Sequence, residues 1–226
     1  AEVWALCSDV KIIEKVHLFA MKRFLGVTFR TPNTMVYGEC GRIPLYIHAY
    51  VRCIAYWLRL TRLPSERLPK KSYNMLLALQ KENKVTWVHY VMITLYRYGY
   101  GLVWENQGVG NVAYFLKEFK NRLVDCHHQD WKSALYSSER YSIYRTFKSS
   151  LCLSAYLSNL KHITMRDALI RFRLGISDLN CHRFRYIKSK NVSLNCPFCP
   201  QLEENEIHLL FVCPKYSELR RSYIPA

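Results

Sequence analysis

The chain has 226 residues, which is long enough for one large domain or two small ones, each with its own core. Half of the residues are hydrophobic and 14% are aromatic, a composition that excludes a chain disordered throughout. The charge is strongly unbalanced, because 33 Lys+Arg oppose 17 Asp+Glu and give a formal net charge of +16. Such a surplus favours a polyanionic partner, either nucleic acid or an anionic membrane surface.

No membrane-spanning segment is predicted, even in the most apolar stretch, 85–104. It contains His89, Arg97 and glycine breaks, so it is too polar to span a bilayer. The odd number of cysteines, nine, and a start without the pattern of a secretory leader favour free thiols in a reducing compartment. We therefore expect an intracellular protein of the nucleus and/or cytoplasm, with nucleic acid (RNA and/or DNA) and no membrane as partner. A start at Ala1 in helical sequence suggests a piece of a longer protein.

Helical patterns follow one another from the N-terminus. Apolar residues three or four apart predict a first helix that ends at Gly26: Val10, Ile13, Val16, Ala20 and Phe24. Pro32 and Pro44 each mark the first turn of a further helix, where the missing N–H costs nothing. The helix from Pro44 has one apolar face and ends before Pro64, and a short basic linker over 64–69 follows.

The middle of the chain continues the helical pattern. Helices are predicted over 73–80, 85–98 and 112–126, with a glycine loop at 107–110, and one helix or a pair over 141–160. A capping-box-like Thr164-x-x-Asp167 predicts a helix that runs through Leu174 and stops at Gly175. Strand-like alternation is scarce. The predicted fold is therefore all-α: a multi-helix array over 1–190, subdivided near 64–70 and 105–111, followed by a small module over 191–226.

The small module contains four residues with the spacing of a metal site, Cys196-x2-Cys199-x8-His208-x4-Cys213. A two-residue spacing lets a tight turn point both sulfur atoms at one ion. Three thiolates and one imidazole make a closed tetrahedral set, which is typical of a structural Zn²⁺ with no position left for water. The alternative is three unrelated cysteines beside an ordinary surface histidine.

The predicted helix around His208 tests whether Cys213 can bind the same ion. We expect a short helix over 203–212 with an acidic first turn. In a continuous helix Cys213 would lie about 140° around the axis from His208, so it must leave the helix to bind the same ion. Pro214 disfavours the α conformation for the residue before it. Glu204 is interpreted either as a partner that orients the imidazole or, preferably, as a solvated acid.

A basic segment, 161–190, precedes the module and holds eight Lys/Arg against two acidic residues. Arginine forks suit phosphates, and the interleaved rings of Phe172, Phe184 and Tyr186 could stack on unpaired bases. The other interpretation, a core position in an amphipathic helix, is preferred for Phe172. The predicted nucleic-acid contacts are Arg166, Arg171, Arg173, Arg183, Arg185, Lys188 and Lys190.

No catalytic residue is predicted in this chain. It has no Asp-Asp pair for a two-metal polymerase site and no hydrolase, metalloprotease or nucleotide-binding motif. The cluster of Asp125, His127, His128 and Asp130 is better explained as a polar helix end than as a nuclease or metal site.

Several sequence blocks resemble the region that follows the polymerase palm in non-LTR (LINE-type) retrotransposon reverse transcriptases. They are Gly41-Arg42-Ile43-Pro44-Leu45, Tyr56-Trp57, Thr86-Trp87, the run from Gly99 to Asn106, Arg171-Phe172-Arg173-Leu174-Gly175, and the metal motif with His208-Leu209-Leu210 and Cys213-Pro214-Lys215-Tyr216.

The resemblance covers about 16–223 and implies a thumb-like helical part followed by a Cys-Cys-His-Cys zinc module. In that family this region is thought to grip template RNA and target DNA, and the palm of the parent RNA-directed DNA polymerase would be a further partner. The palm aspartates and the endonuclease are not in this chain, so we expect no polymerisation by it. The alternatives are a helical protein-interaction scaffold with a structural zinc, or an inert retroelement remnant.

Overall fold

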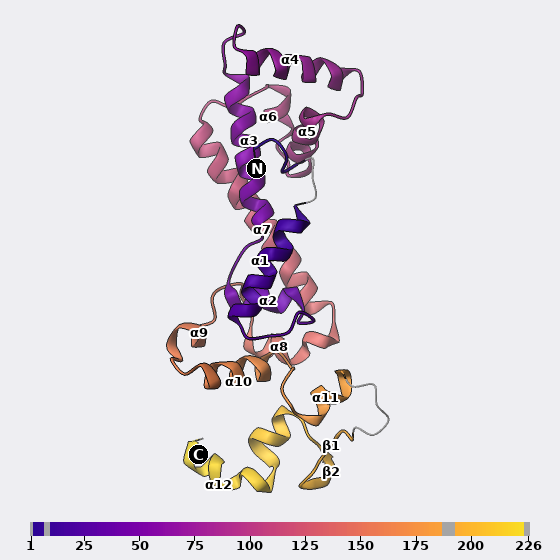
Figure 1. Ribbon diagram of the computed structural model, residues 1–226, viewed down its shortest axis with the longest axis vertical. Coiled ribbons are helices and arrows are strands. Elements are labelled where there is room, and N and C mark those ends of the chain that lie inside the picture. The colour runs from indigo at the N-terminus through magenta and orange to yellow at the C-terminus, as the bar shows by residue number, and fades with distance from the viewer. Residues whose placement is uncertain (1, 7–9, 187–192, 224–226) are drawn as a thin grey trace.

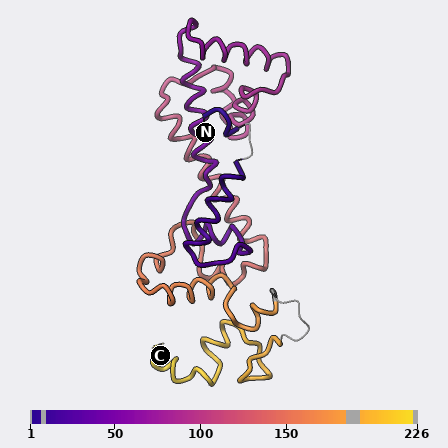
Figure 2. The backbone as a smooth tube through the Cα atoms, viewed as in Figure 1, coloured from indigo at the N-terminus to yellow at the C-terminus, as the bar shows by residue number. Residues whose placement is uncertain are grey.

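The computed structural model describes residues 2–6, 10–186 and 193–223, except for the side chains of Arg185 and Tyr186. The described chain is largely helical, which confirms the predicted all-α class, and it includes one two-stranded hairpin. Figures 1 and 2 show an elongated molecule with helix α4 at one end and the C-terminal residues at the other.

The first half of the molecule is a bundle around one hydrophobic core. Its elements are α3 (Leu45–Thr61), α4 (Leu68–Lys81), α5 (Trp87–Arg97), α6 (Gly101–Glu105) and the first half of α7 (Val112–Tyr136). Trp57 is fully buried at its centre, where its indole N–H donates to the hydroxyl of Tyr73 at 3.1 Å. Its ring stacks on Trp104 with 5.8 Å between centroids. This core fixes the positions of helices α3, α5 and α7 relative to one another.

A second core lies around the other half of α7 (Figure 1). Its elements are α1 (Lys11–Phe24), α2 (Asn33–Cys40), the 3₁₀ turn η1 (Glu139–Tyr141), α8 (Ser142–Phe147), α9 (Tyr156–Asn159) and α10 (Ile163–Arg173). Helix α7 joins the two cores because Phe119 and Leu123 are buried in the first, and Trp131 and Leu135 in the second. Each such buried side chain stabilises the fold by about 1.5–3 kcal/mol.

The C-terminal module is defined here as residues 193–223, and α11 (Asn180–Tyr186) packs beside it. It contains the antiparallel strands β1 (Asn195–Cys196) and β2 (Cys199–Glu203). The π-helical turn η2 (His208–Val212), the 3₁₀ turn η3 (Pro214–Tyr216) and α12 (Ser217–Tyr223) follow. The boundary predicted at 190/191 lies outside the described residues.

The proline and glycine signals located several helix ends correctly. Gly26 adopts a φ of 64°, and the backbone N–H of Val27 donates to the carbonyl of Lys22, which closes α1. Pro32 and Pro44 lie immediately before α2 and α3. Helix α4 begins at Leu68 and takes Pro69 into its first turn, so the predicted linker was too long.

One further prediction needs correction. The capping box was wrong, because α10 already begins at Ile163 and no side chain caps it. Asp167 instead lies against Gly26, where an added Cβ would be 3.2 Å from its carboxylate. Over 141–160 the chain forms two short helices, α8 and α9, joined by a non-helical stretch, which confirms the second of the two predicted alternatives, a pair of helices. None of the helices in the described ranges is long and apolar enough to cross a membrane.

Candidate metal centre

The hairpin brings Cys196 and Cys199 together. Cys196 ends β1 and Cys199 begins β2, and the two face each other in the antiparallel register with Pro197-Phe198 as the turn between them. Cys196 is buried at 2% exposure. The turn therefore points both sulfur atoms to one side, as the two-residue spacing predicts.

A helical turn supplies the other two residues. The Asn205 side chain accepts the backbone N–H of His208 at 2.9 Å and so starts the turn. The N–H of Cys213 donates to the carbonyl of His208 at 2.8 Å, a five-residue bond that widens the turn to π geometry. Cys213 then leaves the helix with φ −61° and ψ 121°, before Pro214. This confirms the predicted break at Cys213.

The helix predicted over 203–212 was wrong at its beginning. Glu203 is the last residue of β2, and helical structure starts only at Glu206. The acidic run therefore does not form a first helical turn. It forms the strand end and loop that lead into η2.

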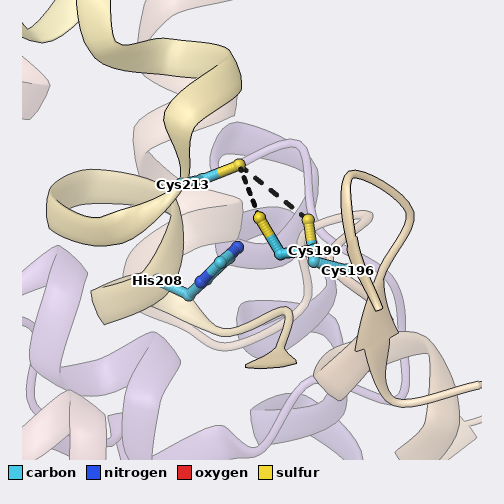
Figure 3. A group of neighbouring side chains, drawn as sticks. All are labelled: Cys196, Cys199, His208 and Cys213. Carbon is cyan, nitrogen blue, oxygen red and sulfur yellow. Dashed lines mark hydrogen bonds between the residues drawn. The ribbon is translucent and has the colours of Figure 1, made fainter. Parts of the chain in front are cut away.

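The four side chains converge on one point (Figure 3). The sulfur of Cys213 lies 3.9 Å from that of Cys196 and 4.0 Å from that of Cys199, and the four candidate ligand atoms lie within 4.8 Å of one another. Tetrahedral Zn²⁺ with Zn–S bonds of about 2.3 Å requires sulfur atoms roughly 3.8 Å apart. The cluster can hold a metal ion, and its ligand chemistry is consistent with zinc.

The imidazole of His208 provides an independent sign of a ligand. Its Nε2 atom is buried and has no hydrogen-bond partner within the described part of the chain. A buried polar atom without a partner costs about 1–3 kcal/mol, so this nitrogen needs an interaction that the protein atoms do not supply. A metal ion between the sulfur atoms and Nε2 would supply it.

The thiol of Cys199 resists ionisation in the absence of a cation. Burial, followed by the neighbouring thiols of Cys213 and Cys196, raises the pKa of Cys199 to about 11. Thiolates are the form that binds metal, so a bound cation would favour ionisation of the Cys199 thiol.

A second buried group, Cys181, His182 and Glu206, lies beside the first. Here both imidazole nitrogens are satisfied: Nε2 of His182 lies 2.6 Å from a Glu206 carboxylate oxygen, and Nδ1 lies 2.8 Å from the hydroxyl of Ser177. No nitrogen of His182 is left for an ion. The group therefore serves as a polar clamp that joins α11 to the C-terminal module.

Glu204 belongs to the same clamp. Its carboxylate accepts the backbone N–H of Asn180 at 2.9 Å, and its carbonyl accepts that of Cys181 at 3.2 Å. It is therefore neither a solvated acid nor the orienting partner of the His208 imidazole. The residue that sequence reasoning missed is Asn205, whose short side chain before a helical turn is a signal that could have been used.

The predicted phosphate-binding arginines fall into different surroundings. Arg171 is exposed and lines a cleft of about 600 Å³ between α10 and the C-terminal module, and Arg183 is exposed on α11. Arg166 lies over the ring of Phe24, 5.4 Å from its centroid. The side chain of Arg185 is not described, and Lys188 and Lys190 lie outside the described residues.

Arg173 has a partner in the protein core. Its guanidinium lies 3.0 Å from a carboxylate oxygen of Glu39, with side-chain exposures of 13% and 0%. The rings of Phe147 and Tyr156 lie beneath it at 5.4 and 5.1 Å. Arg173 therefore has a structural role, because its ion pair holds α10 against α2.

Comparison with family models, curated protein sequences and solved structures finds no match.

Proposed function

We propose that the chain is a nucleic-acid-binding region with a structural zinc in its C-terminal module. The observation that carries the proposal is the cationic surplus. If each of the 17 acidic residues neutralised one cation, 16 of the 33 Lys+Arg would still remain, and a polyanion is the partner that such a surplus attracts. Exposed Arg171 lines the cleft between α10 and the C-terminal module, and exposed Arg183 lies on α11, which packs beside that module.

Zinc at Cys196, Cys199, His208 and Cys213 would hold structure and perform no chemistry. Three thiolates and one imidazole complete a tetrahedral shell and leave no position for a reactive water. The metal would fix the hairpin to η2, and the segment between these two elements contacts the start of α11 through Glu204 and Glu206. In this way it would hold Arg183 in place.

The sequence resemblance extends the proposal to the parent protein. We infer a region of a non-LTR retrotransposon reverse transcriptase that follows the palm and grips template RNA and/or target DNA. The resembling blocks lie in both cores and in the C-terminal module, so the inference concerns most of the chain. No catalytic role is assigned to any residue.

Salt titration of binding tests the function. The full chain should bind single-stranded RNA and duplex DNA at low salt, and its affinity should fall linearly with salt on logarithmic axes. The slope is about 0.7 per phosphate contacted for a single strand. A flat response, or no binding at low salt, would refute the proposal.

A charge-matched pair of variants tests where the nucleic acid lies. Arg171→Gln/Arg183→Gln should reduce the single-strand salt slope by roughly 1.4, the value for two lost phosphate contacts. Lys71→Gln/Lys81→Gln removes the same charge from exposed positions on α4, at the opposite end of the molecule, and should change the slope less (Figure 1). Equal effects would show that charge alone matters and that the C-terminal region is no preferred site.

A protein-docking scaffold remains the second candidate because α1 carries an exposed apolar face. Ile12, Val16 and Phe19 are 66%, 66% and 64% exposed on this helix. Phe19→Asp should abolish docking and leave nucleic-acid affinity unchanged if this face binds a protein partner. Sedimentation of the chain with a purified palm-containing parent fragment would measure the docking.

A further inference from the structure

A tyrosine-lined pocket lies between α1, α3, α5 and α7, away from the metal cluster and from the basic segment. Its volume is about 580 Å³, within the range of about 300–1,000 Å³ that is usual for small-molecule sites. Tyr46 and Tyr50 contribute from α3 and Tyr98 from the end of α5. Sequence reasoning did not identify this site, because its residues come from four separate helices.

The three rings form a rigid aromatic wall. Tyr46 and Tyr50 meet edge to face with 5.3 Å between centroids, and Tyr98 packs edge-on against buried Phe119 at 6.0 Å. Each side chain is half-buried, so its position is set by the core while part of its surface faces the pocket. Within the described part of the chain, none of the three hydroxyl groups is hydrogen-bonded to another protein group. They are therefore available to a ligand.

Basic and acidic side chains line the pocket around these rings. Arg97 is exposed, and its guanidinium lies over the ring of Tyr98 at 5.8 Å. Lys11 also lines the pocket. Of the two acidic residues, Glu14 is already used by the protein, since it accepts from the hydroxyl of Tyr37 and the backbone N–H of Leu45.

Asp130 differs from Glu14 in being exposed on α7 while still lining the pocket. A free carboxylate accepts hydrogen bonds from amino groups and repels phosphate. An arginine beside aromatic rings has the opposite preference and suits a phosphate next to a stacked base. A ligand that satisfies both needs an aromatic face, an amino group and an anion.

We propose that this pocket binds a nucleotide unit by stacking its base on the tyrosines, with its phosphate at Arg97 and the amino group of its base at Asp130. The inference extends the proposed nucleic-acid binding, because the unit would be an unpaired nucleotide of a strand. A free nucleotide has the same chemistry and is the other source. Bases that carry an amino group on their pairing edge are preferred over uracil, which has none.

Fluorescence of an oligoadenylate with one 2-aminopurine tests this proposal on the full chain. Stacking should quench the probe on binding. Tyr46→Leu/Tyr50→Leu should weaken binding by at least about tenfold, since one lost base–aromatic stack commonly has this effect, and should leave duplex affinity unchanged. Tyr114→Leu, the same change at an exposed tyrosine of α7 outside the pocket, should alter neither.

Two further variants test whether the loss of binding comes from lost stacking or from misfolding, and whether Asp130 recognises the base. Tyr46→Phe/Tyr50→Phe keeps the rings and should retain the quenching. Asp130→Asn should reduce the preference for oligoadenylate over oligouridylate at unchanged thermal stability. Competition by AMP, again sensitive to the leucine substitutions, would identify a free nucleotide as the ligand, and failure of AMP to compete would identify a strand.

The outcomes distinguish this proposal from the proposed function. If the wild-type chain binds neither the single strand nor the duplex at low salt, and AMP does not bind, both proposals are overturned. If it binds both with steep salt dependence but the leucine variant binds the single strand as well as wild type does, only the pocket is overturned.

Discussion

Arg173 lies in the basic segment, but its ion pair with Glu39 indicates a structural role instead of phosphate binding. Substitution of Arg173 distinguishes the two roles. Arg173→Gln would leave the Glu39 carboxylate, which is 0% exposed, without its cation. Breaking a buried pair in this way costs about 3–5 kcal/mol. The hydroxyl of Tyr156 still donates to Glu39 at 2.5 Å, so we expect a value at the low end, about 3 kcal/mol.

Thermal unfolding of purified protein measures this loss. For a chain of this size, 1 kcal/mol corresponds to roughly 2–4 °C, so the melting temperature should fall by about 6–12 °C. Arg171→Gln, two residues earlier and exposed, is the control and should stay within about 0.5 kcal/mol. A melting temperature unchanged by Arg173→Gln, together with a loss of RNA affinity, would refute the structural role.

Three further predictions follow from the helical cores. Gly41→Ala should destabilise the fold by about 2–4 kcal/mol in denaturant unfolding. Gly41 has a φ of 58°, and an added Cβ would lie 2.1 Å from the backbone nitrogen of Leu153. Gly110→Ala, with open space around the added Cβ, should leave the stability nearly unchanged. Glu14→Ala should lower the free energy of unfolding by about 1–3 kcal/mol, because it removes the acceptor of the Leu45 N–H at 2.7 Å. An equal loss in Glu82→Ala, at the surface, would contradict this prediction. Stability should fall as pH rises from about 9 to 12, because burial raises the pKa of Cys40 from 9.0 to about 11 and that of Tyr46 from 10.0 to about 12. Raised pKa values mean that the folded state holds these protons more tightly than the unfolded state, so circular dichroism should show no stability loss below pH 9 from these groups.

The metal cluster was predictable from the sequence because its ligands are close together in the chain. Local spacing determines the turn at Cys196 and Cys199, and Pro214 determines the helix break at Cys213. Several helix ends were predictable for the same reason, since proline and glycine act on their own neighbourhood.

Features that depend on distant partners were not predictable. The apolar stripe of α1 identified a helix, yet Val16 is 66% exposed and the helix turns Glu14 and Met21 inward. It does so because Glu14 reaches the start of α3, 31 residues away. The role of Arg173 likewise depends on Glu39, 134 residues earlier, and no local pattern indicates such a pairing.

Metal analysis of the purified full chain tests whether Cys196, Cys199, His208 and Cys213 hold a zinc ion. We expect about one zinc per chain, released only with loss of folded structure in the C-terminal module. Cys199→Ala should abolish stoichiometric zinc, whereas Cys152→Ala, at an exposed cysteine outside the cluster, should retain it. A wild-type chain that folds without metal, or a Cys199→Ala variant that keeps one zinc per chain, would contradict the proposed centre.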